Sequence, residues 1–176
     1  STGTDRLNSC KKAKDLIVTN SRGLVTPEMT TSIVGFMTIC ARRYDYLINS
    51  YQKSIISRDD YNNVYGEVHS LEGKNCCIFG YGDVGFSLAK ALNGLGMNIV
   101  GFKRSIPEKN EDCYSKIENI SNLDKFIQKA DYIINCLPFN ISTKDFFDWQ
   151  IFKKMDCKCF INVGRGGTVN EKDVRE

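Results

Sequence analysis

Several residue types and patterns that mark large classes of protein are scarce in this sequence. Its 176 residues include one histidine, His69, one tryptophan and three prolines, and no apolar run approaches the roughly 18–20 residues of a membrane-spanning helix. The segment from Ser1 to Leu16 is polar and does not look like a signal peptide. The net charge is only +3 and the basic residues form no single block. These absences predict a cytoplasmic protein that binds neither a membrane nor nucleic acid.

Cysteine is abundant, but its spacing excludes an ordinary zinc site. None of the eight cysteines forms a CxxC pair, and a single histidine cannot complete the usual Cys/His ligand set. Cys76, Cys77, Cys136 and Cys159 lie in apolar runs, where a free cysteine behaves as a small hydrophobic residue. We therefore expect no metal, and reduced thiols as in a cytosolic protein.

The alternation of apolar segments after Leu71 predicts an α/β fold. With 41% hydrophobic and 26% charged residues, the chain has a globular composition. One helix is expected after the first strand, with Leu88 and Leu92 on its apolar face, and another at 121–129. Strands that alternate with helices favour a Rossmann-type, doubly wound parallel sheet. The five expected strands are 76–79, 98–102, 117–120, 132–137 and 159–163.

A long amphipathic helix is predicted before this sheet. Thr26 is expected to cap it, Pro27 suits its first position, and apolar residues recur with a period near 3.6 as far as Tyr51. Its apolar face either packs within the chain or forms an interface, and we predict a homodimer through the helix from Pro27 to Tyr51. The polar residues 54–70 are expected to form a connector, and a short helix and strand are expected within 1–20.

A glycine-rich loop follows the first expected strand. Gly80-Tyr81-Gly82-Asp83-Val84-Gly85 has the GxGxxG spacing of dinucleotide-binding loops, between a strand and a helix as the motif requires. Gly80 permits a tight turn, Gly82 leaves room for a pyrophosphate, and Gly85 lets the helix approach the strand. The N–H groups at the start of the helix favour phosphate binding. The loop therefore predicts a dinucleotide site.

The end of the second strand indicates which dinucleotide is bound. An acidic residue about twenty positions after such a loop accepts hydrogen bonds from the adenine ribose. Here Lys103, Arg104 and Ser105 occupy this place. Two cations and a hydroxyl attract a 2′-phosphate, whereas a carboxylate repels it. The pattern favours NADP, and the alternative is that both cations are solvated strand-end charges.

Several motifs, in order along the chain, resemble the D-isomer-specific 2-hydroxyacid dehydrogenase family. They are the glycine loop with the preceding segment 71–74, the strand and proline at 131–138, and above all the run Ile-Asn-Val-Gly-Arg-Gly-Gly-Thr-Val at 161–169. Residues 1–5 are similar to the loop that binds the substrate carboxylate, and the long helix is similar to the interdomain crossover and dimer helix. The resemblance implies hydride transfer between NADP(H), with NAD possible, and a small 2-oxo or 2-hydroxy acid of the glyoxylate or hydroxypyruvate type.

The resemblance also implies roles for residues and segments of this chain. Arg165 would bind the substrate as a catalytic residue, together with Thr2 and Gly3. Residues 1–25 would be a remnant of the substrate-binding domain, 26–70 the crossover and dimerisation helix with its connector, and 71–176 the dinucleotide-binding domain. Besides the glycine loop and the strand-end cations, the implied cofactor-binding residues are Thr26, Cys136, Leu137, Pro138, Val163 and Gly164.

Members of that family also carry a catalytic glutamate and histidine beyond the arginine segment. His69 does not match that position, so this chain is expected to be the central piece of an enzyme and inactive by itself. Gly164 replaces the more usual alanine, and Thr31 or Ser32 stands where the dimer helix usually has a glutamate. The alternative is a corepressor-like module that binds a dinucleotide without turnover. A different dehydrogenase class, such as alanine dehydrogenase, is disfavoured by the run at 162–166.

Overall fold

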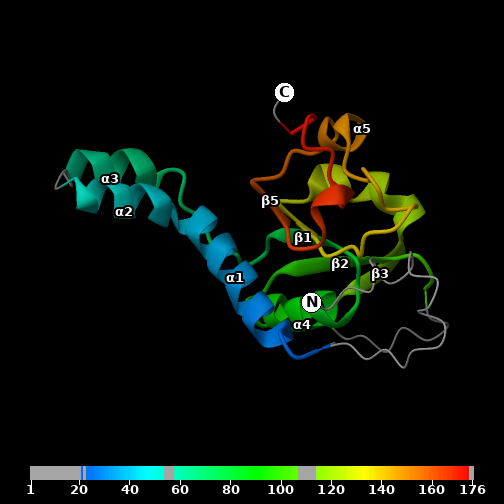
Figure 1. Cartoon of the computed structure of the whole chain (residues 1–176). Helices are drawn as coiled ribbons and strands as arrows, with labels where there is room; N and C mark the ends of the chain where they lie inside the picture. The colour runs from blue at the N-terminus through cyan, green and yellow to red at the C-terminus, as the bar shows by residue number, and fades with distance from the viewer. Residues whose placement is uncertain (1–20, 22, 54–57, 107–113, 175–176) are drawn as a thin grey trace.

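Five parallel strands form the central sheet of the computed structural model, which describes residues 21, 23–53, 58–106 and 114–174 (Figure 1). Their spatial order is β3-β2-β1-β4-β5, and every neighbouring pair runs parallel. The predicted parallel sheet is therefore confirmed. The strand order reverses between β1 and β4, which is where open α/β sheets bind their ligands. The strands are β1 (Asn75–Phe79), β2 (Asn98–Lys103), β3 (Lys116–Asn119), β4 (Tyr132–Asn135) and β5 (Cys159–Asn162).

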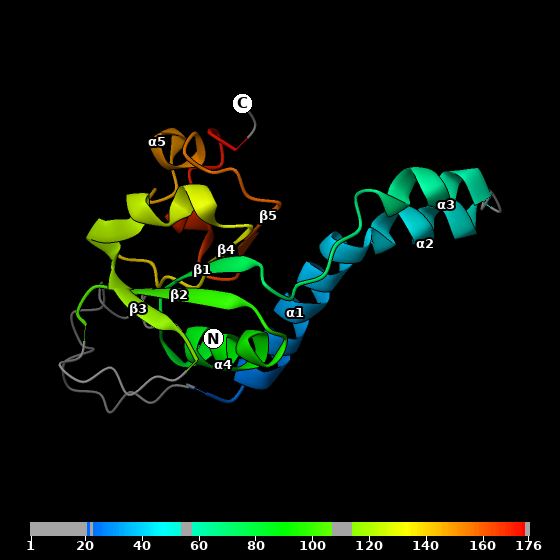
Figure 2. The ribbon, with the colours of Figure 1, turned by 180° about the vertical axis from the view of Figure 1, so that it is seen from behind.

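Helices or helical turns cover both faces of the sheet, as expected of a doubly wound fold. Figure 2 shows α1 (Thr26–Arg42) and α4 (Asp83–Gly94) together on one face. The other face carries the 3-10 turns η2 (Ile120–Lys125) and η3 (Ile127–Lys129) and the short helix α5 (Trp149–Phe152). Within the described part of the chain, no helix has the length and apolar character needed to cross a bilayer.

Two hydrophobic clusters, one on each face, hold these layers together. On the face that α1 and α4 cover, which we call the helical face, these two helices pack on alternate residues of the strands. On the other face, the Phe79 ring stacks on Phe102 at a centroid distance of 4.6 Å and meets the edge of Phe147 at 5.1 Å. Burying one such side chain contributes roughly 1.5–3 kcal/mol. The fully buried side chains of the helical face include Ile33, Met37, Ile78, Leu88, Leu92 and Ile134.

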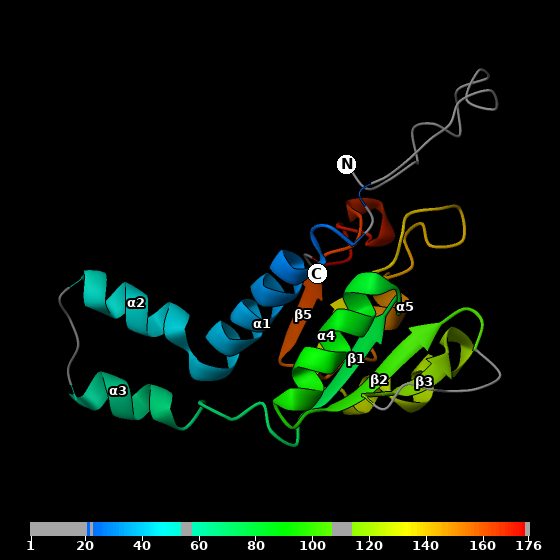
Figure 3. The ribbon, with the colours of Figure 1, turned by 90° about the horizontal axis from the view of Figure 1, so that it is seen from below.

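The single helix predicted from Pro27 to Tyr51 is wrong, because the structure has two helices there. The first, α1, ends at Arg42, and Arg43 adopts a left-handed conformation with φ of 51°. The second, α2 (Tyr44–Gln52), then continues in a different direction (Figure 3). The apolar pattern runs across the break, so periodicity alone could not reveal it.

Ion pairs of Arg43 explain why the bend is stable. Its guanidinium lies 3.5 Å from the carboxylate of Asp45 and also pairs with Glu67. Glu67 follows α3 (Arg58–Tyr65), a helix that occupies part of the predicted connector. The left-handed residue thus contacts a residue far along the chain, and no local sequence pattern predicts this contact.

Two further local predictions need correction. Val25 is the N-cap residue of α1 and Thr26 is its first helical residue. No α-helix forms at 121–129, because the Asn119 side chain accepts a hydrogen bond from Ser121 N–H at 3.0 Å and begins a tighter 3-10 turn. The helix and strand expected within 1–20 lie outside the described residues.

Residues 43–53 and 58–65, which together we call the helical arm, extend away from the sheet (Figures 1 and 3). No residue of α2 is buried. Large apolar or aromatic side chains are instead exposed along the arm, among them Ile48 at 55% and Tyr51 at 76%. Such a concentration of exposed apolar side chains is typical of an interaction surface.

Candidate functional site

The ends of four strands converge at one edge of the sheet, which we call the carboxyl edge. The N–H of Gly80, just after β1, donates to Phe102 of β2 at 3.2 Å. The N–H of Cys136, just after β4, donates to Phe79 of β1 at 2.7 Å, and that of Gly164, after β5, donates to Asn135 of β4 at 3.0 Å. The glycine loop, the segment 136–138 and the segment 163–165 are therefore neighbours in space.

Close backbone approach explains two of the glycines at this edge. A Cβ on Gly80 would lie 2.7 Å from the carbonyl oxygen of Cys136, and Gly80 has a φ of 92° that side chains disfavour. A Cβ on Gly164 would lie 2.6 Å from the carbonyl oxygen of Leu137. Neither neighbour is a movable side chain, so any larger residue would push these backbone segments apart.

Gly82 differs from its neighbours because it faces open space. An added Cβ would meet nothing within 4 Å. Gly82 is the N-cap residue of α4, and it has no side chain with which to cap the helix. The positive end of the helix dipole and the N–H groups of its first turn therefore lie beside an opening. This arrangement fits a phosphate group, which is the requirement that a dinucleotide imposes.

The side chain of Tyr81 does not point into this opening. It is 6% exposed and covers Gly101 of β2, where an added Cβ would overlap its ring. Ser115 Oγ donates a hydrogen bond to its hydroxyl at 2.5 Å. Lys103 Nζ lies 5.6 Å from the centre of the ring. Tyr81 is one of the six loop residues predicted to contact a cofactor, but its side chain packs against β2 instead.

The three polar residues at the end of β2 and just after it are more exposed than Tyr81. Lys103 is half-buried, whereas Arg104 and Ser105 are exposed. The carbonyl of Arg104 accepts a hydrogen bond from Asn119 Nδ2 at 2.8 Å, which holds this segment to the end of β3. Two cationic side chains therefore stand at the β2 end of the carboxyl edge.

A buried polar network ties the ends of β4 and β5 together, and sequence reasoning missed it. Asn135 and Thr168 are fully buried. The Asn135 side chain donates to Asn162 Oδ1 at 3.0 Å and to Thr168 Oγ1 at 2.7 Å, and it accepts from Leu137 N–H at 3.0 Å. The sequence did contain a signal for this network. Asn135 lies within the apolar run 132–137, and a buried amide needs hydrogen-bond partners.

The same network positions the segment that carries Arg165. The carbonyl oxygen of Arg165 accepts hydrogen bonds from Thr168, from N–H at 3.0 Å and from Oγ1 at 2.6 Å. The side chain of Arg165 is exposed at the carboxyl edge. The structure therefore places Arg165 near the segments that flank the glycine loop, as expected from its position after β5.

Thr26 reaches this region through the packing of α1 on α4. One turn further along α1, Thr30 Oγ1 donates to Ser87 Oγ of α4 at 3.1 Å. The start of α1 therefore lies beside the first turns of α4. Thr2 and Gly3, the other two residues implied for the substrate, lie outside the described residues.

The only histidine of the chain lies at the opposite, amino edge of the sheet. The Nε2 atom of His69 is 2.8 Å from the hydroxyl of Tyr132, the first residue of β4. Burial, then the nearby Lys158, lowers the pKa of His69, which favours the neutral ring. His69 was not expected to match the catalytic histidine of the family, and the structure gives it a contact with the sheet, remote from Arg165.

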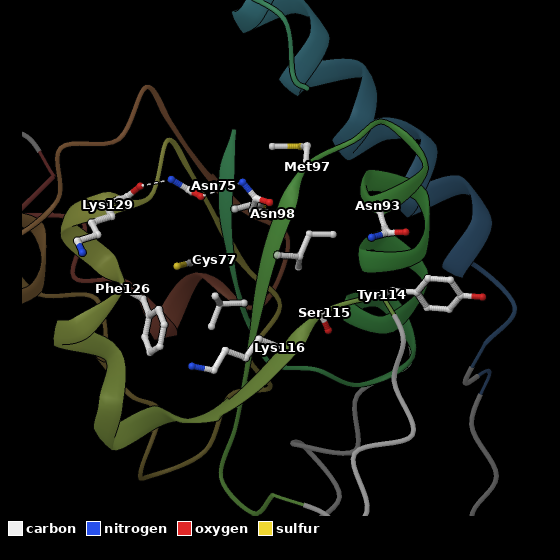
Figure 4. A pocket seen from close by; sticks show the side chains of 13 residues that line it. Asn75, Cys77, Asn93, Met97, Asn98, Tyr114, Ser115, Lys116, Phe126 and Lys129 are labelled. Carbon is white, nitrogen blue, oxygen red and sulfur yellow. Dashed lines mark hydrogen bonds between the residues drawn. The ribbon is translucent and has the colours of Figure 1, made fainter. Parts of the chain in front are cut away.

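A cavity of about 460 Å³ also lies at the amino edge, away from the glycine loop (Figure 4). Its lining includes Asn75, Asn98 and Lys116, the first residues of β1, β2 and β3. The Asn75 amide is already used, because it donates to the carbonyl of Lys129 at 3.0 Å. Among the described residues no group of three or more His, Cys, Asp or Glu side chains could hold a metal ion. The carboxyl edge is therefore the candidate site.

The parallel sheet, the glycine loop and the uncapped start of α4 together define a Rossmann-type dinucleotide-binding domain. The family model described as the NAD-binding domain of D-isomer specific 2-hydroxyacid dehydrogenases matches residues 34–176. The chain belongs to this family, which confirms the resemblance seen in its motifs.

Individual relatives agree with this assignment. A hydroxypyruvate reductase of Thermotoga maritima is 27% identical over 176 residues, which cover 99% of this chain and 54% of that protein. A crystal structure from Pyrococcus horikoshii superimposes with a TM-score of 0.84 at 26% identity, covering 99% of this chain and 53% of that one. A D-isomer specific 2-hydroxyacid dehydrogenase of Xanthobacter autotrophicus, solved with NADPH, has a TM-score of 0.80 at 20% identity, covering 98% and 69%. The chain thus spans about half the length of the first two.

The buried network makes a specific prediction about stability. Replacing Thr168 by valine keeps the shape of the side chain but removes the acceptor of Asn135 and the donor to Arg165. We expect the free energy of unfolding to fall by about 1–3 kcal/mol, because a buried amide loses a partner. Urea unfolding measures this change. Thr31→Val is the control: Thr31 is exposed and bonds only within α1, so a change under about 0.5 kcal/mol is expected. Equal effects of the two substitutions would contradict this role of Thr168.

Proposed function

We propose that this chain is the cofactor-binding part of an enzyme that transfers a hydride between NADP(H) and a small 2-oxo or 2-hydroxy acid of the glyoxylate or hydroxypyruvate type. The observation that carries the proposal is the opening in front of Gly82, at the start of α4 and beside the segments that follow β4 and β5. A bound nicotinamide cofactor would supply or accept the hydride. The name of the Thermotoga maritima relative, hydroxypyruvate reductase, supports this substrate class.

In this proposal the glycine loop binds the pyrophosphate. The N–H groups at the start of α4 point toward the opening at Gly82, where the positive end of the helix dipole favours an anion. Tyr81 contributes its backbone, since its side chain is packed on Gly101. Asp83 and Val84 lie in the first turn of α4. Gly85 lets the helix approach β1, because an added Cβ would lie 2.5 Å from the carbonyl oxygen of Gly80.

The nicotinamide end of the cofactor would lie along the ends of β4 and β5. Segments 136–138 and 163–164 form this part of the edge, with Cys136, Leu137 and Pro138 on one side and Val163 and Gly164 on the other. Thr26, at the start of α1, would close the site from the α4 side. The close backbone contacts at Gly164 keep these segments from shifting when a ligand binds.

Arg165 is the proposed substrate-binding residue. A guanidinium donates two parallel hydrogen bonds to a carboxylate and stays charged at any working pH, so it suits a 2-oxo acid. Thr2 and Gly3 are proposed to assist it, with residues 1–25 belonging to a substrate-binding domain. Residues 26–70 would then form the crossover and dimerisation region, and 71–176 the cofactor domain.

The cations after β2 predict a preference for NADPH. We expect NADPH to bind on the order of tenfold more tightly than NADH, since about 1.4 kcal/mol is tenfold and one charge-assisted hydrogen bond is worth about 1.5–3 kcal/mol before exposure reduces it. Lys103→Asp should reduce or reverse this ratio, because it repels the 2′-phosphate and offers an acceptor to an unmodified ribose. Calorimetric titration of both cofactors measures the ratio.

Two controls accompany this titration. Lys90→Asp makes the same change of charge at an exposed site on α4 and should leave the ratio unchanged. Raising the ionic strength should shrink the preference, because exposed charges are screened. Equal affinities of the two cofactors, or tighter binding of NADH, would overturn the assignment to NADP.

Catalysis by this chain alone is not expected. Reduction of a 2-oxo acid needs a proton donor, and the single histidine lies at the amino edge, bonded to Tyr132. We expect the purified chain to bind NADPH without oxidising it when glyoxylate or hydroxypyruvate is added, as followed by NADPH absorbance. Steady oxidation would refute this and would require another acid near Arg165.

We propose that two copies of the chain associate through the helical arm. Ile48 and Tyr51 are exposed there at 55% and 76%, and burying them would remove apolar surface from water. Sedimentation velocity should show a dimer at micromolar concentration. Ile48→Glu should shift it to monomer, whereas Ile141→Glu, at a 99% exposed position outside the arm, should not. A monomeric wild-type chain at high micromolar concentration would count against the dimer.

A further inference from the structure

Two thiols from distant parts of the chain meet where α1 packs on β5 (Figure 3). The Sγ atom of Cys40, in α1, donates to the carbonyl oxygen of Lys158 at 3.6 Å. Cys159, the next residue and the first of β5, packs on the face of the sheet that α1 covers and lines the same groove as Cys40. Both cysteines are free. The two cysteines therefore lie close together in space without being bonded.

Both thiols are also accessible. Cys40 and Cys159 are only half-buried, and they line a groove of about 990 Å³ between α1 and β5. The basic side chain of Lys158 lines the same groove. A small polar molecule can therefore reach Cys40 without unfolding of the sheet.

The other described cysteines lack this combination. Cys76 and Cys77 are 1% and 2% exposed, and as neighbours in β1 they pack in the clusters on opposite faces of the sheet. Burial raises the pKa of Cys77 and of Cys136 to about 12, which suppresses their reactive thiolate forms. Cys157 packs in the cluster on the face opposite Cys159.

We propose that Cys40 and Cys159 form a disulfide when the protein meets a small-molecule disulfide such as oxidised glutathione. Cys40 attacks one sulfur of that molecule as its thiolate, forms a mixed disulfide and releases one glutathione thiolate. Cys159 then attacks the Cys40 sulfur, forms the new S–S bond and expels the second glutathione thiolate. The protein loses two protons and two electrons, and the oxidised glutathione becomes two reduced molecules.

The order of attack follows from the surroundings of the two thiols. Cys159 packs against the apolar cluster of this face, and burial raises the pKa of its thiol, so Cys40 is the better first nucleophile. Once Cys40 carries the glutathione, the proximity of Cys159 makes the second step intramolecular. The resulting disulfide would link α1 covalently to β5, although the two elements are far apart in the sequence. It lies at the amino edge and is independent of the proposed function.

Mass spectrometry of the reduced chain after incubation with oxidised glutathione tests the proposal. We expect an intact mass lower by two hydrogen atoms and, after digestion without reductant, one cross-linked pair of peptides that contains Cys40 and Cys159. The bond restrains the unfolded chain over a long loop, so Tm should rise by roughly 5 °C or more and return with dithiothreitol. Variants that lack one thiol identify the steps.

Cys159→Ser should accumulate a glutathione adduct on Cys40, and Cys40→Ser should give neither an adduct on Cys159 nor a cross-link to it. Cys157→Ser is the matched control and should still form the Cys40–Cys159 bond. A wild-type chain that keeps glutathione on Cys40 without closing, joins a different pair of cysteines, or does not react would overturn the proposal. These wild-type outcomes do not depend on whether any variant folds.

Discussion

The close approach of three backbone segments at the carboxyl edge is the constraint on which the candidate site depends. Gly80, Leu137 and Gly164 lie so near one another that a Cβ on either glycine would collide with a carbonyl oxygen. The buried side-chain amide of Asn135 stabilises this arrangement, because it has hydrogen-bond partners near the ends of both β4 and β5. These contacts fix the relative positions of the strand ends that lie next to the glycine loop.

Charge and packing are combined at the end of β2. Lys103 lies over the ring of Tyr81, which in turn covers Gly101, so the strand-end cation rests on a buried aromatic ring of the glycine loop. A cation held in this way loses less conformational freedom on binding a phosphate than a fully mobile lysine does. The Lys103 side chain therefore connects the glycine loop with the predicted 2′-phosphate site.

Long-range contacts decide the geometry on the other side of the sheet. The bend at Arg43 is stabilised by Glu67, and it directs α2 away from the sheet instead of along it. Before the bend, α1 packs on β5 and brings Cys40 against the start of that strand. The helical arm thus follows from the interruption at Arg43, whereas the proximity of Cys40 to Cys159 follows from the packing of α1 on the sheet.

The sequence by itself determined the parallel α/β fold, the five strands and the glycine loop, because these features depend on local hydrophobic periodicity and on glycines at fixed spacing. It also placed Arg165 and the cations at the end of β2 at the carboxyl edge, since a position at or just after the end of a strand is enough to locate a residue there. Only the tertiary structure revealed the network of Asn135 with Thr168, the burial of Tyr81, the break at Arg43 and the proximity of Cys40 to Cys159. Each of these depends on partners that are distant in sequence, and no local pattern encodes which distant residue a side chain will meet.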